Sequence, residues 1–361
     1  MRVLVVDDSA VHRLSLSSAL KQIPSVTSVE TARSGPEAIR LIHASAYDLV
    51  TLDIEMPEMD GFAVLRWIMA TRPLPVLVVS DALHDRVAIV ALELGAFDVL
   101  RKPTARAGGQ VEWREQLARA VAGASGLHLR ELERRARSGA PAERPAPPGP
   151  LRPGARGESP ARAAAIVVAA STGGPAALRD LFASLPPRGS VVAAVAQHMS
   201  APFTKSLAAR LGTTTGWRAV EASDGEEAVP GTILVAPGGH DMELVREGSR
   251  VVCRVRGVPP GEERRGWSPS GDRLLASAAR VYGAGTVAVV LTGMGSDGAE
   301  GAAAVDAAGG LVVAESSETA VVAGMPEAAA RRVPAALRLP LHEIGRRLER
   351  RIPLATLPGS V

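Results

Sequence analysis

Short apolar runs alternate with amphipathic segments along the first hundred residues of the chain. Strand-like apolar runs lie at residues 2–6, 28–32, 49–52, 76–79 and 98–100. The segments between them have the apolar spacing of helices, at residues 10–23, 35–45, 61–70 and 84–94. Five strands joined by helices predict a parallel, doubly wound sheet, which places a functional site at the carboxyl ends of its strands.

The same alternation resumes at residue 165. Strand-like runs lie at residues 165–170, 191–196, 231–235, 286–291 and 311–314. Helix-like segments lie at residues 175–185, 203–211 and 299–308. This second series predicts another doubly wound, mainly parallel α/β domain of the Rossmann-like class.

The segment between the two series lacks the pattern of a folded core. Residues 110–122 and 127–137 have helical composition, and the second stretch is rich in arginine. Its arginines either form a solvated helix face or contact acidic partners or nucleic acid. Residues 138–160 are rich in proline and glycine, which predicts a semi-extended, flexible tether. We therefore expect two domains and a linker, at residues 1–104, 163–358 and 105–162 respectively.

The composition is that of a water-soluble globular protein: of 361 residues, 46% are hydrophobic and 22% are charged. The net charge of +3 gives no argument for a nucleic-acid partner. No apolar run reaches about 18 residues, so we expect no membrane insertion. The acidic pair Asp7 and Asp8, directly after the first apolar run, is unlike a signal peptide, so we expect a cytoplasmic protein. The single cysteine, Cys253, excludes an internal disulfide, and we expect it to be a small residue of a buried or edge strand.

Polar side chains stand at the ends of four of the first five predicted strands. Asp7 and Asp8 follow the first strand, Asp53 the third, Ser80 the fourth and Lys102 the fifth. Singly, an aspartate pair can cap a turn or helix, and a lysine can simply be solvated. Together, three converging carboxylates need a cation, and Mg²⁺ prefers such oxygen ligands. Asp53 would then accept a phosphoryl group, whose oxygens Ser80 and Lys102 would contact.

Three motifs of this segment closely resemble those of response-regulator receiver domains: VVDDS at residues 5–9, LDIEMPEMDG at 52–61 and RKP at 101–103. The resemblance implies a flavodoxin-like fold with five βα units and phosphorylation of Asp53 by a histidine kinase. It implies Mg²⁺ held by Asp8, Asp53 and the backbone carbonyl of Glu55, with Asp7 acting through water. Two further residues match the switch positions of that family, namely Ser80 and Phe97.

The second domain also carries polar residues where predicted strands end, chiefly Ser171, His198 and Asp297. These could form a nucleophile, a base and an orienting carboxylate. Thr172 lies beside the nucleophile, and glycines around Met294 allow that loop to approach closely, so the Met294 N–H is a candidate oxyanion donor. The alternatives are that Ser171 only caps a helix, that His198 is a hydrogen-bonded core residue and that Asp297 lies in a turn. No Gly-x-Ser-x-Gly elbow surrounds Ser171, which argues against a standard α/β-hydrolase.

Five motifs, in order, resemble the catalytic domain of the chemotaxis protein-glutamate methylesterase family, CheB. They are ASTGGP at residues 170–175, QHM at 197–199, APGG at 236–239, LTGMGSDG at 291–298 and GMP at 324–326. The resemblance maps the family's triad onto Ser171, His198 and Asp297. It implies hydrolysis of glutamyl methyl esters on the cytoplasmic helices of chemoreceptors, with release of methanol, and deamidation of receptor glutamines. It also implies that the unphosphorylated receiver covers the active-site face, and that phosphorylation at Asp53 opens it.

Two stretches depart from that pattern. Residues 267–272 read WSPSGD where the family usually has RPSVD, and Glu315 follows Ala314 where glutamine is common. Other functions remain open: the same chemistry in a non-flagellar chemotaxis-like pathway, or a non-enzymatic binding module switched by the receiver. A DNA-binding output is disfavoured because no recognition-helix pattern is present.

Overall fold

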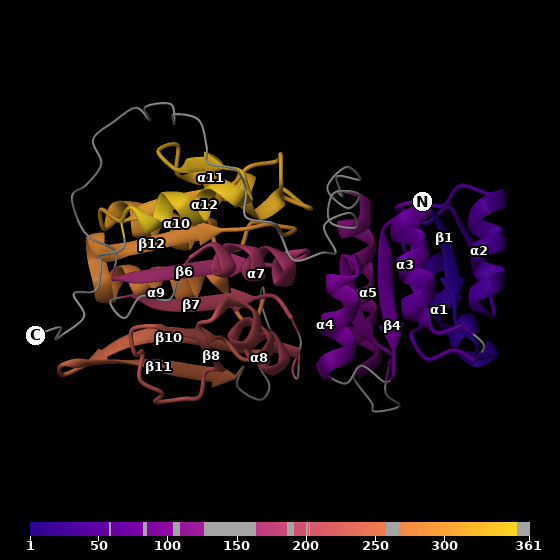
Figure 1. Ribbon diagram of the computed structural model, residues 1–361, viewed down its shortest axis with the longest axis horizontal. Helices are drawn as coiled ribbons and strands as arrows, with labels where there is room; N and C mark the ends of the chain where they lie inside the picture. Colours follow the sequence, from indigo (N-terminus) through magenta and orange to yellow (C-terminus); the bar gives the residue numbers. More distant parts are fainter. Residues whose placement is uncertain are drawn as a thin grey trace, which may run out of the picture.

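The chain folds into two α/β units, each built on a parallel sheet (Figure 1). The computed structural model describes residues 1–57, 59–81, 85–103, 109–125, 164–185, 191–199, 201, 203–257 and 267–351. The predicted helix at 127–137 and the proline-rich tether therefore lie outside the described residues. Within the described part of the chain, no helix is long and apolar enough to cross a membrane.

The first sheet has the strand order β2-β1-β3-β4-β5, and every pairing is parallel. Its strands are β1 (Arg2–Val6), β2 (Ser28–Ala32), β3 (Leu49–Leu52), β4 (Val76–Ser80) and β5 (Asp98–Arg101). Its helices are α1 (Ala10–Lys21), α2 (Gly35–Ala44), α3 (Gly61–Thr71), α4 (Asp85–Glu93) and α5 (Gly109–Ser125). The order reverses between β1 and β3, where ligands bind in such sheets. The predicted flavodoxin-like fold is confirmed.

Local sequence explains where the first three helices begin. Ser9, Ser34 and Asp60 each precede a helix, and each side chain accepts a backbone N–H from the first turn. Strands β3 and β4 are wholly buried because helices cover both faces of the sheet, whereas the edge strand β2 is mostly exposed. These caps and buried strands fix the sheet edge that carries the polar residues.

Helix α5 lies beyond the expected boundary at residue 104 and packs on the sheet of the first unit. Trp113, Leu117 and Val121 follow helical spacing and pack in one cluster with Val5 of β1 and Phe97, the residue before β5. The helical composition of residues 110–122 was correctly identified, but composition did not show what the helix packs against. The apolar stripe of α5 packs against the first sheet.

The second sheet has the strand order β14-β13-β12-β6-β7-β9-β8 and is also parallel throughout. Its strands are β6 (Ala165–Ala170), β7 (Val192–Gln197), β8 (Arg218–Glu221), β9 (Thr232–Val235), β12 (Thr286–Val290), β13 (Leu311–Glu315) and β14 (Leu337–Leu339). Its helices are α7 (Gly174–Ser184), α8 (Phe203–Thr215), α9 (Gly271–Tyr282), α10 (Ala299–Ala307), α11 (Gly324–Arg332) and α12 (Leu341–Glu349). The predicted Rossmann-like architecture is confirmed.

An antiparallel hairpin stands apart from this sheet, formed by β10 (His240–Glu247) and β11 (Arg250–Gly257). The sequence analysis did not predict the hairpin as a unit. Its strands alternate charged and apolar residues, so one face packs on α9 and the other meets solvent. Cys253 is fully buried on β11, as expected for a small strand residue.

Helices α4 and α5 lie between the two sheets in Figure 1. Helix α4 packs against α7 and α8 of the second unit. Phe203, the first residue of α8, is 1% exposed and joins the apolar cluster of the first unit together with Leu92 of α4. The two domains therefore share an apolar contact at this point.

Candidate active site and candidate phosphorylation site

Ser171 lies directly after β6, at the carboxyl edge of the second sheet. Its backbone N–H donates to the Thr292 carbonyl at 3.0 Å, and the Gly174 N–H donates to the Ser171 carbonyl at 2.8 Å. Gly173 has a φ of 79°, which turns the chain into α7. A Cβ on Gly174 would lie 2.0 Å from Gln197 Oε1, so only glycine fits there. The two glycines thus hold Ser171, which is 5% exposed, at the strand end.

His198 lies at the end of the neighbouring strand, β7. Its backbone N–H donates to the Ala170 carbonyl at 2.9 Å, which places His198 beside Ser171. Its Nε2 and Asp297 Oδ2 are 2.7 Å apart, and the histidine side chain is 1% exposed. Its buried Nδ1 has no hydrogen-bond partner among the described residues. That nitrogen is therefore the one available to a serine proton.

Asp297 is held at the amino terminus of α9. Its carboxylate accepts the Gly271 N–H at 2.6 Å, the Asp272 N–H at 3.0 Å and the Ser270 hydroxyl at 3.1 Å. Burial alone would raise the pKa of Asp297, but the hydrogen bond and charge of His198 and these N–H groups outweigh it and lower the pKa. Asp297 is consequently a carboxylate that can orient His198 and stabilise its protonated form.

The loop that departs from the family pattern supplies those donors. Ser270 caps α9, and the sequence signal that could have found it is a serine before a helix with an acidic residue in the first turn. Burial, with the charge of Asp297, raises the pKa of Asp272, although the Gly301 N–H donates to it at 2.8 Å. The unusual sequence therefore still positions Asp297.

Gln197 was not assigned a role from sequence, although it lies in a quoted motif. It is 1% exposed, and its Nε2 donates to the Ser171 carbonyl at 2.8 Å and to the His198 carbonyl at 3.2 Å. One carboxamide thus joins the backbone of the proposed nucleophile to that of the proposed base. This contact joins the ends of β6 and β7 and forms only in the folded chain, so the sequence alone did not reveal it.

The loop after β12 closely approaches Ser171. A Cβ on Gly293 would lie 2.7 Å from Ser171 Cβ, so a larger residue would force this loop away. Thr292 Oγ1 donates to the Thr172 carbonyl at 2.8 Å, and the Thr292 N–H donates to Glu315 Oε2 at 2.8 Å. Thr172 and Met294, the expected oxyanion residues, are the chain neighbours of Ser171 and Gly293, which approach each other here.

Trp267 adds an aromatic wall that the sequence analysis did not foresee. Its ring stacks on the His198 imidazole, with centroids 4.3 Å apart and planes 7° apart. Arg119 of α5 lies over the same indole, with its Cζ 5.0 Å from the ring centroid. One turn later, a Cβ on Gly123 would lie 3.9 Å from Met294 Sδ and Thr172 Oγ1. Helix α5 of the first unit therefore faces the candidate active site.

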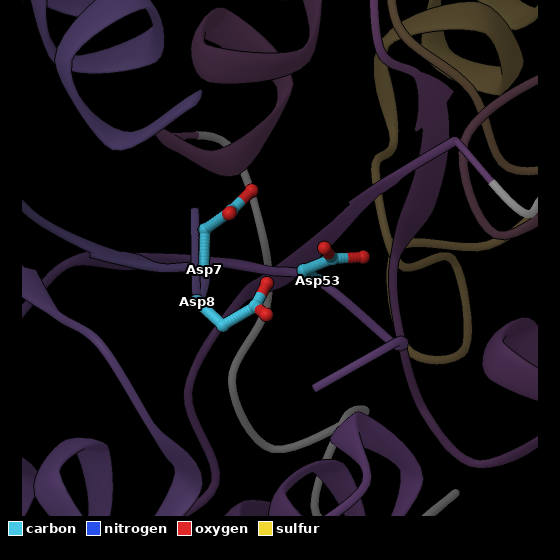
Figure 2. Close-up of side chains that lie close together, drawn as sticks. All are labelled: Asp7, Asp8 and Asp53. Atoms are coloured by element: carbon cyan, nitrogen blue, oxygen red, sulfur yellow. The ribbon is translucent and has the colours of Figure 1, made fainter. Parts of the chain in front are cut away.

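The first domain gathers three carboxylates, as Figure 2 shows for Asp7, Asp8 and Asp53. One oxygen of each lies within 4.8 Å of the others. Lys102 Nζ is 2.6 Å from Asp53 Oδ2 and 2.7 Å from Asp7 Oδ2. Burial lowers the pKa of Lys102, but its hydrogen bonds and charge interactions with Asp53 and Asp7 outweigh this and raise the pKa. The carboxylate set fits a hard divalent cation.

The remaining predicted residues surround this cluster. Ser80 is fully buried, and its Oγ has no hydrogen-bond partner among the described residues. Phe97 is 2% exposed in the core beside α5, and the Glu55 N–H donates to Asp53 Oδ1 at 3.3 Å. His12 was missed: its Nδ1 lies 3.0 Å from Lys102 Nζ, a contact made from the first turn of α1. Only the folded sheet brings these residues to one edge.

Comparison with known proteins assigns both units. The CheB methylesterase family model matches residues 166–348, and the response regulator receiver domain model matches residues 3–109. A protein-glutamate methylesterase/protein-glutamine glutaminase of Geobacter sulfurreducens is 43% identical over 341 residues, 91% of each chain. One of Anaeromyxobacter dehalogenans is 45% identical over 332 residues, 91% of this chain and 89% of that one.

Among solved structures, the CheB methylesterase catalytic domain of Thermotoga maritima is 38% identical, with a TM-score of 0.49. It covers 52% of this chain and 98% of its own. The family matches and the full-length relatives confirm the resemblance drawn from the sequence motifs. The chain therefore belongs to the CheB methylesterase family and carries a response regulator receiver domain ahead of its catalytic domain.

Proposed function

We propose that the protein hydrolyses methyl esters of glutamate side chains on the cytoplasmic helices of chemoreceptors, and deamidates receptor glutamines. The names of its relatives support this reaction. The observation that carries it is the His198–Asp297 pair beside Ser171, with His198 Nδ1 left for a proton. Asp297, held ionised by α9, completes the set.

In this reaction Ser171 Oγ attacks the ester carbonyl while His198 Nδ1 takes the serine proton. The Ser171 loop and the Met294 N–H face the oxygen that becomes negative. The proton passes from His198 to the leaving methoxide, which departs as methanol and leaves a glutamyl ester on Ser171. Water, deprotonated by His198, then releases glutamate and restores the serine. With glutamine as substrate the leaving group is ammonia, and the other steps are unchanged.

The receiver would control this site through phosphorylation of Asp53 by a chemotaxis histidine kinase. Asp8, Asp53 and the Glu55 carbonyl would hold Mg²⁺, with Asp7 through water, and the ion would offset the charge of the phosphoryl group. The close carboxylates support this assignment. Lys102 would move from the carboxylates to a phosphoryl oxygen, and the Ser80 hydroxyl, which has no partner in the described part of the chain, would donate to another.

The contacts of α4 and α5 support inhibition in the unphosphorylated state. Gly123 faces Met294 and Thr172, so α5 lies where a receptor helix would have to enter. Phosphorylation relieves the block only if the modified receiver favours an undocked arrangement. Phe97, packed in the same cluster as α5, would transmit the change from Ser80.

The test is methanol release from methylated chemoreceptor membranes, with and without a small phosphodonor and Mg²⁺. Wild type should release methanol faster with the phosphodonor, Asp53→Asn should keep only the basal rate, and Ser171→Ala should fall to background. Equal stimulation of Asp53→Asn would remove Asp53 from the control. Release that survives Ser171→Ala would make Ser171 structural, and wild type at background would favour a receiver-switched binding module.

A further inference from the structure

The imidazole of His198 is fixed by two contacts of different kinds. On its edge, Nε2 bonds Asp297 at 2.7 Å. On its face, the Trp267 ring lies almost parallel at a centroid distance of 4.3 Å. A single hydrogen bond leaves a ring free to rock about that bond, whereas a stacked indole restricts the plane. Trp267 therefore keeps Nδ1 directed along the edge that faces away from Asp297.

The same indole is touched from the other domain. The Arg119 guanidinium lies over it, and Arg119 belongs to α5, whose apolar side is packed into the receiver core. Arg119 and Gly123 are one turn apart and lie on one side of the helix. Helix α5 consequently meets the catalytic domain at two points, the loop that carries Met294 and the ring that stacks on His198.

We propose that Trp267 is a positioning residue for His198 and that Arg119 acts on His198 through Trp267. This inference rests on the proposed function, because it assumes that His198 takes the Ser171 proton. The imidazole then becomes a cation, and an aromatic face attracts a cation. With Arg119 over the indole, the ring already attracts one positive charge, and the second arises on the His198 imidazole, whose side chain is 1% exposed and stacks on the same ring.

The receiver thus inhibits in two separable ways. Helix α5 blocks entry of the substrate by its position, which does not depend on the charge of residue 119. Arg119 also competes for the indole ring that would stabilise the imidazolium formed during the reaction, and this competition requires both a charged residue 119 and the indole. The second effect disappears when either partner is removed, so a double-mutant cycle isolates it from simple loosening of the interface.

The experiment measures methanol release from methylated chemoreceptor membranes by the full-length protein. With phosphodonor present, Trp267→Leu should lower kcat by about 3- to 30-fold at unchanged KM, and Trp267→Phe should restore most of it. Without phosphodonor, Arg119→Met should raise the rate about threefold or more, and only where Trp267 is intact. Arg114→Met, an exposed arginine of the same helix, is the matched control and should change neither rate.

Each outcome separates this inference from the proposed function. Wild-type kcat in Trp267→Leu, or an Arg119→Met effect of equal size with and without Trp267, would overturn the inference while Ser171-dependent release upholds the reaction. Release that does not depend on Ser171, or none, would overturn both. Melting curves by circular dichroism establish that each variant is folded, and Trp267→Met replaces Trp267→Leu if that variant unfolds.

Discussion

Lys102 carries the positive charge that balances the buried carboxylates of the receiver. Its side chain is 7% exposed, and those of Asp7 and Asp53 are 3% and 4% exposed. Replacing Lys102 with methionine keeps an apolar stem of similar length and removes the ammonium. The two carboxylates nearest to it then lose their hydrogen-bonded partner while remaining buried. Breaking a buried ion pair in this way costs about 3–5 kcal/mol.

The stabilisation that Lys102 provides through its ion pairs depends on pH. The pKa of Lys102 is raised in the folded state, so its stabilisation is complete below the ordinary lysine pKa of 10.5 and is lost as pH rises through the higher folded value. The full loss is therefore expected at pH 7. Lys21→Met, an exposed lysine at the end of α1, is the matched control and should change stability by less than about 0.5 kcal/mol.

The assay is urea unfolding followed by circular dichroism, with and without Mg²⁺. A ligand that binds only the folded state stabilises by RT ln(1 + [L]/Kd), about 2.7 kcal/mol at a hundred times Kd. Mg²⁺ should recover more stability in Lys102→Met than in wild type, because no ammonium competes for Asp7 and Asp53. A Lys102→Met protein as stable as Lys21→Met at pH 7 without Mg²⁺ would refute the electrostatic argument.

Three further predictions concern other groups. Burial raises the pKa of Asp98 to about 6, so the folded state loses stability relative to the unfolded state as pH rises from about 4 to 6. Asp98→Asn should therefore add about 1–3 kcal/mol to the free energy of unfolding at pH 7 and nothing near pH 3.5. Urea unfolding midpoints at the two pH values measure this difference. Burial raises the pKa of the Cys253 thiol to about 12, so Ellman's reagent at pH 8 should leave the native protein unmodified and react fully in denaturant; rapid native labelling would contradict the burial. Ser270→Ala removes a helix cap and a donor to Asp297, and should cost about 1 kcal/mol and lower kcat about tenfold, whereas the cap variant Ser34→Ala should lose stability alone.

The sequence pattern predicted the features that depend on residues close together along the chain, namely the strands and the helix starts. The strand bounds 2–6, 28–32 and 49–52 agree with β1, β2 and β3, because buried strands and capped helices are local signals. Sites of parallel sheets lie at the carboxyl ends of the strands, and this rule correctly predicted that Asp7, Asp8 and Asp53 lie close together. Parallel sheets make this possible, since all their carboxyl ends share one edge.

What the sequence did not reveal depends on surfaces that meet only after folding. Trp267 was identified as a departure from the family, but its stacking on His198 joins segments far apart in the chain. The helix around Arg119 was identified, yet its two partners, the receiver sheet and Trp267, lie on different elements. Hydrophobic periodicity identifies the apolar face of a helix such as α5, but it does not identify the surface that covers this face.

Gly123 is a position at which one substitution would change how tightly α5 packs against the catalytic domain. Glycine inside a helix costs about 1 kcal/mol relative to alanine, so α5 is destabilised at the position nearest Met294 and Thr172. A methyl group there would meet Met294 and Thr172 at 3.9 Å, which is ordinary contact distance. One added carbon would therefore stiffen the helix and tighten its fit at once. If α5 inhibits as proposed, Gly123→Ala would lower the basal rate of methanol release without altering Ser171 or Asp53.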